Sequence, residues 1–237
     1  MSTQHTFDAG ILSRGWLATH LATGTDEDVP VLYGTLLIET FADGVRLTAT
    51  DRMLLLSTWV PGARVPVGCP EPALDEAPDT VTVVRDPDSR GRALLTYLRK
   101  LAAKAEKDEQ PAILVDLHVG VPAEEADEPG FPGMELSTVV IEYPEHERVV
   151  LPTVDGTFPD YRRLLVGHES KRMDVVAFGG DNLARLGQVA KVVGSFVHCT
   201  FGGPKKAVAV EVGVVPPVVR GVVMPVATGV ELEAVAS

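Results

Sequence analysis

The chain has 237 residues, of which 45% are hydrophobic and 23% are charged, so its composition is that of an ordinary globular protein with one large domain or two small ones. The sequence argues against a membrane span, because no run of about 18 apolar residues occurs. It also argues against a signal peptide, because residues 1–5 lack a basic start and an apolar core. Two distant cysteines, Cys69 and Cys199, fit a reducing compartment, so we expect a cytoplasmic protein in which both are small buried side chains.

The acidic residues are concentrated in the first two thirds of the chain. Residues 1–159 carry 12 Lys/Arg and 26 Asp/Glu, whereas residues 160–237 carry 9 and 7, which together give the net charge of −12. A protein of this charge is not expected to coat nucleic acid generally, because phosphates repel it. The acids cluster in presumed loops, however, so basic groups can still line one face.

The start of the chain predicts a strand, a helix and three more strands, which we call the first unit. Its helix, residues 11–22, places Leu12, Trp16 and Leu17 on one face at helical spacing. The expected strands are residues 5–9, 31–41, 45–50 and 53–60, with a tight turn at 42–44. Five prolines then mark residues 61–79 as a linker or a long crossover.

The same order of elements recurs in a second unit. A helix is expected over residues 90–107, and its apolar stripe consists of Leu94, Leu95, Leu98, Leu101 and Ala105. The expected strands are residues 80–85, 112–119, 136–143 and 148–152. Residues 121–133, rich in proline, glycine and acids, are expected to form a loop.

A third unit follows near the C-terminus. Asp181 is the expected N-cap of its helix, and the apolar stripe of that helix consists of Leu183, Leu186, Val189, Ala190 and Val193. The expected strands are residues 173–178, 195–200, 207–212 and 219–226. The chain therefore predicts three copies of one strand-helix-three-strand unit.

Signatures of catalysis are missing from the sequence. There is no Gly-x-Ser-x-Gly elbow and no phosphate-binding loop, and the six histidines share no metal-ligand spacing with each other or with the cysteines. Acidic clusters at 26–28, 71–79 and 124–128 could attract Mg²⁺, but they read more simply as solvated charge runs in loops. We therefore expect no catalytic residue, no metal site and no cofactor.

Three short motifs carry the remaining information. Residues 158–163 read Phe-Pro-Asp-Tyr-Arg-Arg, residues 49–51 read Ala-Thr-Asp, and residues 222–225 read Val-Val-Met-Pro. In composition, order and approximate spacing these motifs resemble those of the bacterial DNA polymerase III beta subunit, the sliding clamp family. The second motif departs after three residues, because Arg52-Met53-Leu54-Leu55 stands where that family has Gly-His-Arg-Leu.

The resemblance implies an α+β protein of the DNA clamp fold, with antiparallel sheets outside and helices on one face. Residues 1–156 resemble the middle clamp domain of that family, and residues 157–237 resemble a partial or compressed last domain. Two units make one clamp domain, so three units make one and a half. Either the last domain is compressed, or the ring closes differently, with another copy completing the third unit.

The resemblance also implies a surface for duplex DNA on the helices. The candidate residues are the helix cations Arg14, Arg92, Arg99, Lys100, Lys104, Lys107, Arg185 and Lys191. Long flexible cations suit a partner that must slide, because their phosphate contacts do not depend on base sequence. From the residues alone, a solvated helix face is the alternative interpretation.

A second implied surface binds peptides of DNA polymerase and of the clamp loader. The candidate residues are Thr50, Met53, Leu55, Pro159, Arg163, Leu164, Val222, Val223, Met224 and Pro225. Methionines are adaptable wall residues for such a pocket, and Arg163 could meet a peptide acid or carbonyl. The alternative is that these residues only seal an interface between domains.

These observations predict a DNA sliding clamp, a homo-oligomeric processivity factor that binds duplex DNA without sequence specificity and tethers a polymerase. The alternative is a non-ring clamp homologue that regulates replication or repair through protein interactions. A third interpretation, an unrelated enzyme that uses its acidic loops for metal, would require a metal-dependent activity. A tetramer would fit a third unit completed by another copy, and a trimer would fit a compressed domain.

Overall fold

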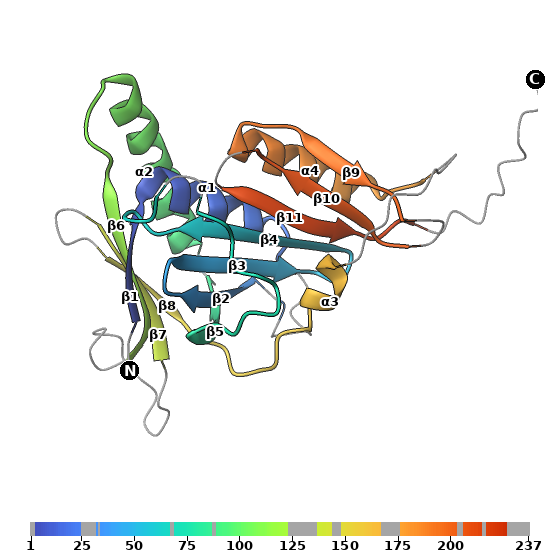
Figure 1. Ribbon diagram of the computed structural model, residues 1–237, viewed down its shortest axis with the longest axis horizontal. Helices are drawn as coiled ribbons and strands as arrows, with labels where there is room; N and C mark the ends of the chain where they lie inside the picture. The colour runs from blue at the N-terminus through green and yellow to red at the C-terminus, as the bar shows by residue number, and fades with distance from the viewer. Residues whose placement is uncertain are drawn as a thin grey trace, which may run out of the picture.

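The computed structural model describes residues 3–24, 32, 34–66, 69–86, 89–122, 137–143, 148–166, 176–202, 206–214 and 217–226 (Figure 1). The acidic clusters at 26–28 and 124–128, and the first half of the strand expected over 173–178, lie outside these residues.

The three units expected from the sequence are present in chain order. The first unit comprises β1 (Thr3–Asp8), α1 (Ala9–His20), β2 (Thr35–Phe41), β3 (Gly44–Thr50) and β4 (Leu54–Pro61). The second unit comprises β5 (Thr80–Arg85), α2 (Arg90–Lys107), β6 (Leu114–Pro122), β7 (Ser137–Glu142) and β8 (Arg148–Pro152). A short helix, α3 (Arg162–Leu165), precedes the third unit, which comprises α4 (Gly180–Val193), β9 (Val197–Thr200), β10 (Val208–Val212) and β11 (Val218–Val223).

The strands form two antiparallel sheets. One is four-stranded, in the order β1-β6-β7-β8, and the other is seven-stranded, in the order β5-β2-β3-β4-β11-β10-β9. The first two units therefore exchange their first strands: β1 pairs with β6 of the second unit, and β5 pairs with β2 of the first. The third unit joins the large sheet through β11, which pairs with β4 from Val218↔Trp59 to Val223↔Leu54.

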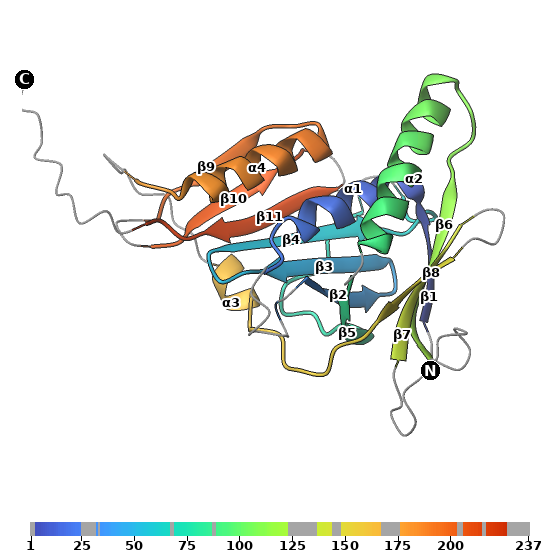
Figure 2. The same ribbon diagram turned by 180° about the vertical axis from the view of Figure 1, so that it is seen from behind.

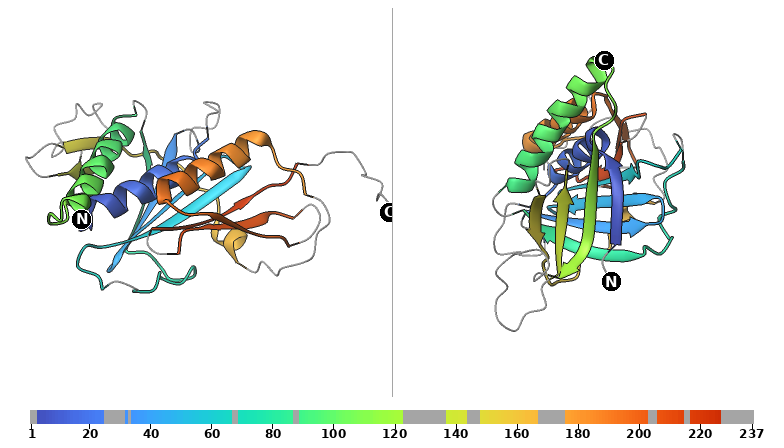
Figure 3. Two further views of the ribbon diagram at one scale, coloured as in Figure 1. Left: turned by 90° about the horizontal axis from the view of Figure 1, so that it is seen from above. Right: turned by 90° about the vertical axis from the view of Figure 1, so that its left-hand side faces the viewer.

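The helices lie together on one side of the sheets. Seen from above, α2, α1 and α4 follow one another in a row, and from behind α1 lies between the other two (Figures 2 and 3). α2 and α4 turn an apolar stripe to the sheets and polar residues to solvent, as the sequence predicts, whereas no residue of α1, which lies between them, is exposed. The mixed fold with two antiparallel sheets and a helical face confirms the expected fold class.

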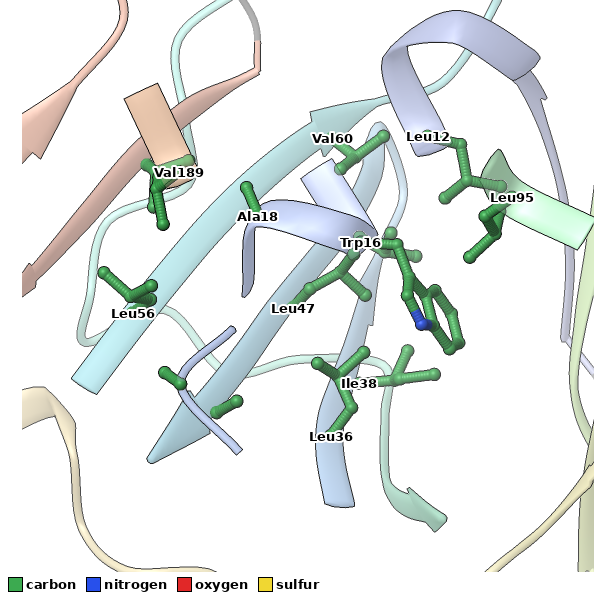
Figure 4. Close-up of a cluster of buried hydrophobic side chains, with 14 of the residues drawn as sticks. Leu12, Trp16, Ala18, Leu36, Ile38, Leu47, Leu56, Val60, Leu95 and Val189 are labelled. Carbon is green, nitrogen blue, oxygen red and sulfur yellow. The ribbon is translucent and has the colours of Figure 1, made fainter. Parts of the chain in front are cut away.

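Trp16 of α1 lies at the centre of the main core. It is 1% exposed and lies among Leu95 of α2 and Leu36 and Ile38 of β2 (Figure 4). The cluster extends to Leu186 and to Val189 of α4, so a single core runs through all three units. Burial of large apolar side chains is the main stabilising contribution to such a fold.

The helices α1 and α2 pack antiparallel and closely. A Cβ added to Gly10, near the start of α1, would lie 3.0 Å from Cβ of Ala102, near the end of α2. At the other end, the charge of Arg92 reaches His20, the last residue of α1, and helps to lower its pKa. Glycine at position 10 therefore permits the close approach of the two helices.

The structure corrects four expectations. Gly179, rather than Asp181, is the N-cap of α4, and Asp181 lies in the first turn. The described part of the strand expected over 173–178 forms no strand. Neither cysteine is buried as expected, since Cys69 is half-buried and Cys199 is exposed, and Leu183, assigned to the apolar stripe of α4, is 50% exposed. These differences concentrate in the third unit, where side chains and backbone have fewer neighbours.

Candidate functional site

The junction of residues 153–162 is anchored to the large sheet by Glu39. This carboxylate is 2% exposed on β2, where it accepts hydrogen bonds from the hydroxyl of Tyr161 and from Nη2 of Arg162. Burial and the hydrogen bond to Glu39 raise the pKa of Tyr161 to about 12. The phenol therefore stays protonated at neutral pH and serves as a donor.

The three motifs singled out in the sequence meet beside this anchor. Leu55 of β4 and Val222 of β11 belong to one small buried cluster with Tyr161, and Leu165 of α3 packs against it. The amide of Met224 donates to the carbonyl of Met53 at 2.8 Å, so the ends of β4 and β11 are joined directly. Residues separated by more than 100 positions thus form one surface.

Gly221 sets the distance between β4 and β11, whose pairing forms the seam between the first and third units. A Cβ at position 221 would lie 2.0 Å from the carbonyl oxygen of Leu55. Only glycine allows β11 to approach β4 this closely, because any other side chain would meet backbone. The seam between the first and third units therefore depends on one residue of a strand whose sequence is otherwise β-branched and charged.

The turn between β3 and β4 is held by its own side chains. Asp51 Oδ1 accepts from the amides of Met53 at 2.9 Å and Leu54 at 2.8 Å, and the hydroxyl of Thr50 donates to the carbonyl of Leu54 at 3.0 Å. Arg52 lies in the left-handed region, at φ 79°. These bonds place Met53 at the rim of the junction surface.

The residues proposed for peptide binding divide by exposure. The exposed members are Met53, Pro159, Arg163 and Leu164, and Met224 and Pro225 are half-buried. The buried members are Thr50, Leu55, Val222 and Val223. Val223 faces the main core rather than the junction, so it supports the surface from below.

Two hollows flank the junction. A cavity of about 580 Å³ lies between residues 153–162 and the strands β2 and β5, and Glu39, Tyr161 and Pro159 are among its lining residues. A second hollow of about 270 Å³ lies over β9, β10 and β11, next to α3; Leu165, Thr200 and Gly221 are among the residues that line it. Of the ten proposed residues only Pro159 lines either hollow, whereas Leu165, adjacent to Leu164, lines the second.

Glu71 is a structural residue, although it lies in a segment whose sequence predicts a solvated charge run. Its carboxylate lies 3.3 Å from Nε of Arg46 on β3 and also pairs with Arg220 on β11. Nη2 of Arg46, a fully buried residue, donates to the carbonyl of Pro72 at 2.5 Å. The crossover therefore covers the large sheet and bridges the first and third units. Only the pairing of β4 with β11 brings Glu71 and Arg220 together, so the sequence near either residue does not predict their contact.

The helix cations fall into two groups. Lys100, Lys104 and Lys107 are exposed on α2, whose 18 residues contain six Lys/Arg and one Glu. They form no ion pair within the described part of the chain. The second half of α2 projects beyond α1 and α4 (Figures 1 and 2).

Of the remaining predicted cations, Arg185 and Arg92 have structural partners. Nε of Arg185 donates to the carbonyl of Leu21 at 2.6 Å, and its Nη1 pairs with Asp51. Nε of Arg92 lies 3.8 Å from Asp86, a buried carboxylate that also accepts from the amide of Arg92 at 3.0 Å and so caps α2. Arg185 thus ties α4 to the first unit. Arg14 and Arg99 are half-buried, and Lys191 is exposed.

Neither a metal centre nor a membrane helix is found in the described ranges. No group of three or more His, Cys, Asp or Glu side chains there could hold a metal ion. Of the helices in the same residues, none is long and apolar enough to cross a bilayer.

Comparison with known proteins identifies the fold. No family model and no curated protein matches the sequence. Among solved structures, the chain is similar to a DNA polymerase sliding clamp from Pseudomonas aeruginosa, with a TM-score of 0.59 and 17% identity over 94% of this chain and 66% of that one. It is similar to a sliding clamp from Caulobacter crescentus with a TM-score of 0.58 and 17% identity, covering 96% of this chain and 66% of that one.

A third similar structure is the DNA polymerase III subunit beta from Pseudomonas aeruginosa bound to griselimycin, at a TM-score of 0.59 and 16% identity, with coverage of 95% and 65%. The chain thus spans about two thirds of the length of these clamps. At this level of identity the likeness concerns the fold, and the fold of this chain is that of the bacterial sliding clamps.

Proposed function

We propose that the protein is a sliding clamp, a non-enzymatic processivity factor that holds duplex DNA against its helical face and tethers a DNA polymerase. The observation that carries this proposal is the row of three helices on one side of a clamp fold, with the exposed cations of α2 on that side. Residues 1–156 serve as one clamp domain, and residues 157–237 serve as part of another.

The DNA surface consists of the solvent-facing cations of the helices, foremost Lys100, Lys104 and Lys107. Their exposure leaves the ammonium groups available to phosphates. Contacts of this kind are insensitive to base sequence and weaken steeply as salt rises, because binding releases counterions. The acidic remainder of the chain repels DNA and confines it to this face.

Retention on primed or nicked circular DNA tests the surface. Lys100→Glu with Lys104→Glu abolishes retention at low salt, because two phosphate contacts become repulsions. The matched control, Arg64→Glu with Lys206→Glu, makes the same charge change at exposed residues outside the helices and keeps retention. Equal retention by both double variants would remove the helical face from the proposal.

The partner surface for polymerase and clamp-loader peptides runs along α3, from Met53 and Met224 to the hollow of about 270 Å³ over the third unit. Its exposed apolar groups include Met53, 43% exposed, and Leu164, 46% exposed. Arg163, whose side chain is 88% exposed, is free to turn from Asp160 to a peptide carboxylate or carbonyl.

Peptide affinity tests this surface. Leu164→Ala with Met224→Ala weakens binding of a polymerase-derived peptide by about tenfold or more, as expected for central anchors. Val214→Ala, at a residue that is 74% exposed elsewhere on the third unit, leaves the affinity unchanged. Unchanged binding by the double variant would contradict the assignment.

A second candidate function is a regulatory clamp homologue that does not form a ring. This alternative is favoured if the chain stays monomeric in solution. Polymerase processivity on primed circular DNA separates the two: the clamp extends the length of the product, and the regulator does not.

A further inference from the structure

The third unit presents an open sheet edge, whereas the corresponding edges of the first two units are paired. In the large sheet, β9 is the terminal strand and pairs only with β10 among the described residues. It is the first strand after α4, just as β2 follows α1 and β6 follows α2. Both of those strands receive a partner from the neighbouring unit, because β5 pairs with β2 and β1 pairs with β6. By comparison with the first two units, no strand of the described residues lies on the open side of β9.

The described residues of the third unit also include no first strand before α4. The segments just before α1 and α2 are strands because the neighbouring unit pairs with them. The described residues just before α4, Val176 to Gly179, form no strand, and one backbone bond from the amide of Val226 to the carbonyl of Ala177 joins them to the end of the sheet. Among the described residues, an open edge and a segment with one backbone bond to the residues after β11 thus occur together, and an exchange of strands would pair both.

One flank of α4 is apolar and open. At about 100° per residue, Leu183, Gly187 and Ala190 lie on the flank opposite Arg185, which faces α1 and bonds to its C-cap. Leu183 is 50% exposed, and a Cβ at Gly187 would meet no atom within 4 Å. In the first two units, the corresponding helices α1 and α2 pack closely on each other. Phe196, which is 59% exposed, lies between α4 and β9 in the same unit.

We propose that a second copy of this chain covers this surface across a two-fold axis, so that two third units complete one clamp-type domain. A second copy is the occupant because the missing parts are a helix and a first strand of this same repeat. The first two units demonstrate that such units exchange strands reciprocally, so the surface is self-complementary. This inference rests on the proposed clamp function, in which the contact makes three clamp domains from two chains.

A second open sheet edge, at β8, then closes the ring. β8 is the terminal strand of the four-stranded sheet and is the last strand of its unit, as β4 and β11 are of theirs. Because β4 pairs with β11 within the chain, last strands are the elements that join neighbouring domains. Pairing of β8 with β8 of another copy joins two such dimers into a closed assembly of four chains and six domain equivalents.

The mass of the full chain in solution, measured by sedimentation equilibrium, tests the inference. The wild-type chain assembles in an even number of copies, four when both ends are paired. Leu183→Glu and, separately, Gly187→Trp raise the dissociation constant of the contact between third units at least about tenfold and halve the mass. Gly187→Trp has open space in the single chain, so its fold is kept. The control, Ala184→Glu, changes the adjacent residue on the solvent side of the helix and leaves the mass unchanged.

A wild-type trimer or a strict monomer at micromolar concentration would overturn the inference, and so would an unchanged mass in both variants. The same samples are assayed for retention on circular DNA. A trimer that is retained leaves the clamp function standing without this contact, whereas a tetramer that is never retained keeps the contact and removes the function.

Discussion

The first two units and the third unit carry the same pattern of elements, yet they differ in how completely they are buried. Every residue of β2 and β3 is buried, because the helices cover one face of these strands while the crossover and the junction cover the other. In β9, two residues are exposed and two are half-buried. The repeat therefore needs a second unit to bury its edge and its helix flank, and within the described residues no further unit covers the third.

The largest expected effect is a difference in the free energy of unfolding lost by core substitutions in the first two units and in the third. Trp16→Ala costs about 3–5 kcal/mol of the free energy of unfolding, because it empties the centre of the shared core. Leu186→Ala, in α4, costs about 2 kcal/mol, at the low end of the range for such substitutions, because its surroundings are less complete and relax more easily. Urea denaturation measures both, and an equal cost would contradict the contrast between the regions.

The packing of α1 on α2 makes stability depend on pH. Burial, followed by the charge of Arg92, lowers the pKa of His20 from 6.5 to about 4. Between these two pH values, His20 binds a proton in the unfolded chain but not in the folded chain. The neutral His20 therefore makes its full contribution to stability above about pH 6.5. That contribution, about 3 kcal/mol, is lost as the pH falls to about 4.

Chemical denaturation across this pH range measures the effect of His20. In His20→Gln the slope of stability against pH between about 6.5 and 4 is smaller than in the wild type, because the remaining dependence comes from the carboxylates. Parallel curves for the two proteins would show that His20 is not the titrating group.

A smaller effect is expected where the junction is anchored to the sheet. Glu39→Gln removes the charge that holds Tyr161 and Arg162, at a cost of about 2 kcal/mol, less than for a fully buried pair because Arg162 is partly exposed. The pKa of Tyr161 falls from about 12 toward the ordinary value, as ultraviolet titration would record. Tyr161→Phe, which removes only the hydroxyl, costs about 1 kcal/mol. A tyrosine titration unchanged by Glu39→Gln would contradict the anchor.

The smallest effect concerns the rim of the seam between the first and third units. Arg52 occupies a left-handed backbone conformation where the sliding clamp family has glycine. Arg52→Gly relieves that strain but loosens the unfolded chain, for a net gain below about 1 kcal/mol. Arg52→Ala removes the same charge and keeps the Cβ, so it gains nothing. Thermal unfolding compares the two, and an equal gain would assign the effect to charge rather than to backbone.

Much of this protein follows from the sequence alone. Apolar periodicity of 3.6 located the helices, and β5, α2 and β8 have the bounds that the sequence predicted. The three short motifs identified the fold, and they do meet at the seam between β4 and β11. These features are local, since spacing, turn chemistry and a leucine stripe act between residues close in the chain.

Only the tertiary structure decided which charges are structural. The sequence predicts a solvated charge run at Glu71 and a DNA contact at Arg185, and it places Glu39 in a strand. In the structure each of the three bonds to a residue more than 100 positions away. Their partners depend on the pairing of β4 with β11 and on the route of the junction, and long-range pairing leaves no periodic trace. The exposure of Leu183 in a predicted apolar stripe has the same cause. The apolar pattern of a helix predicts which residues would be buried, whereas the neighbours present in the folded structure determine whether they are buried.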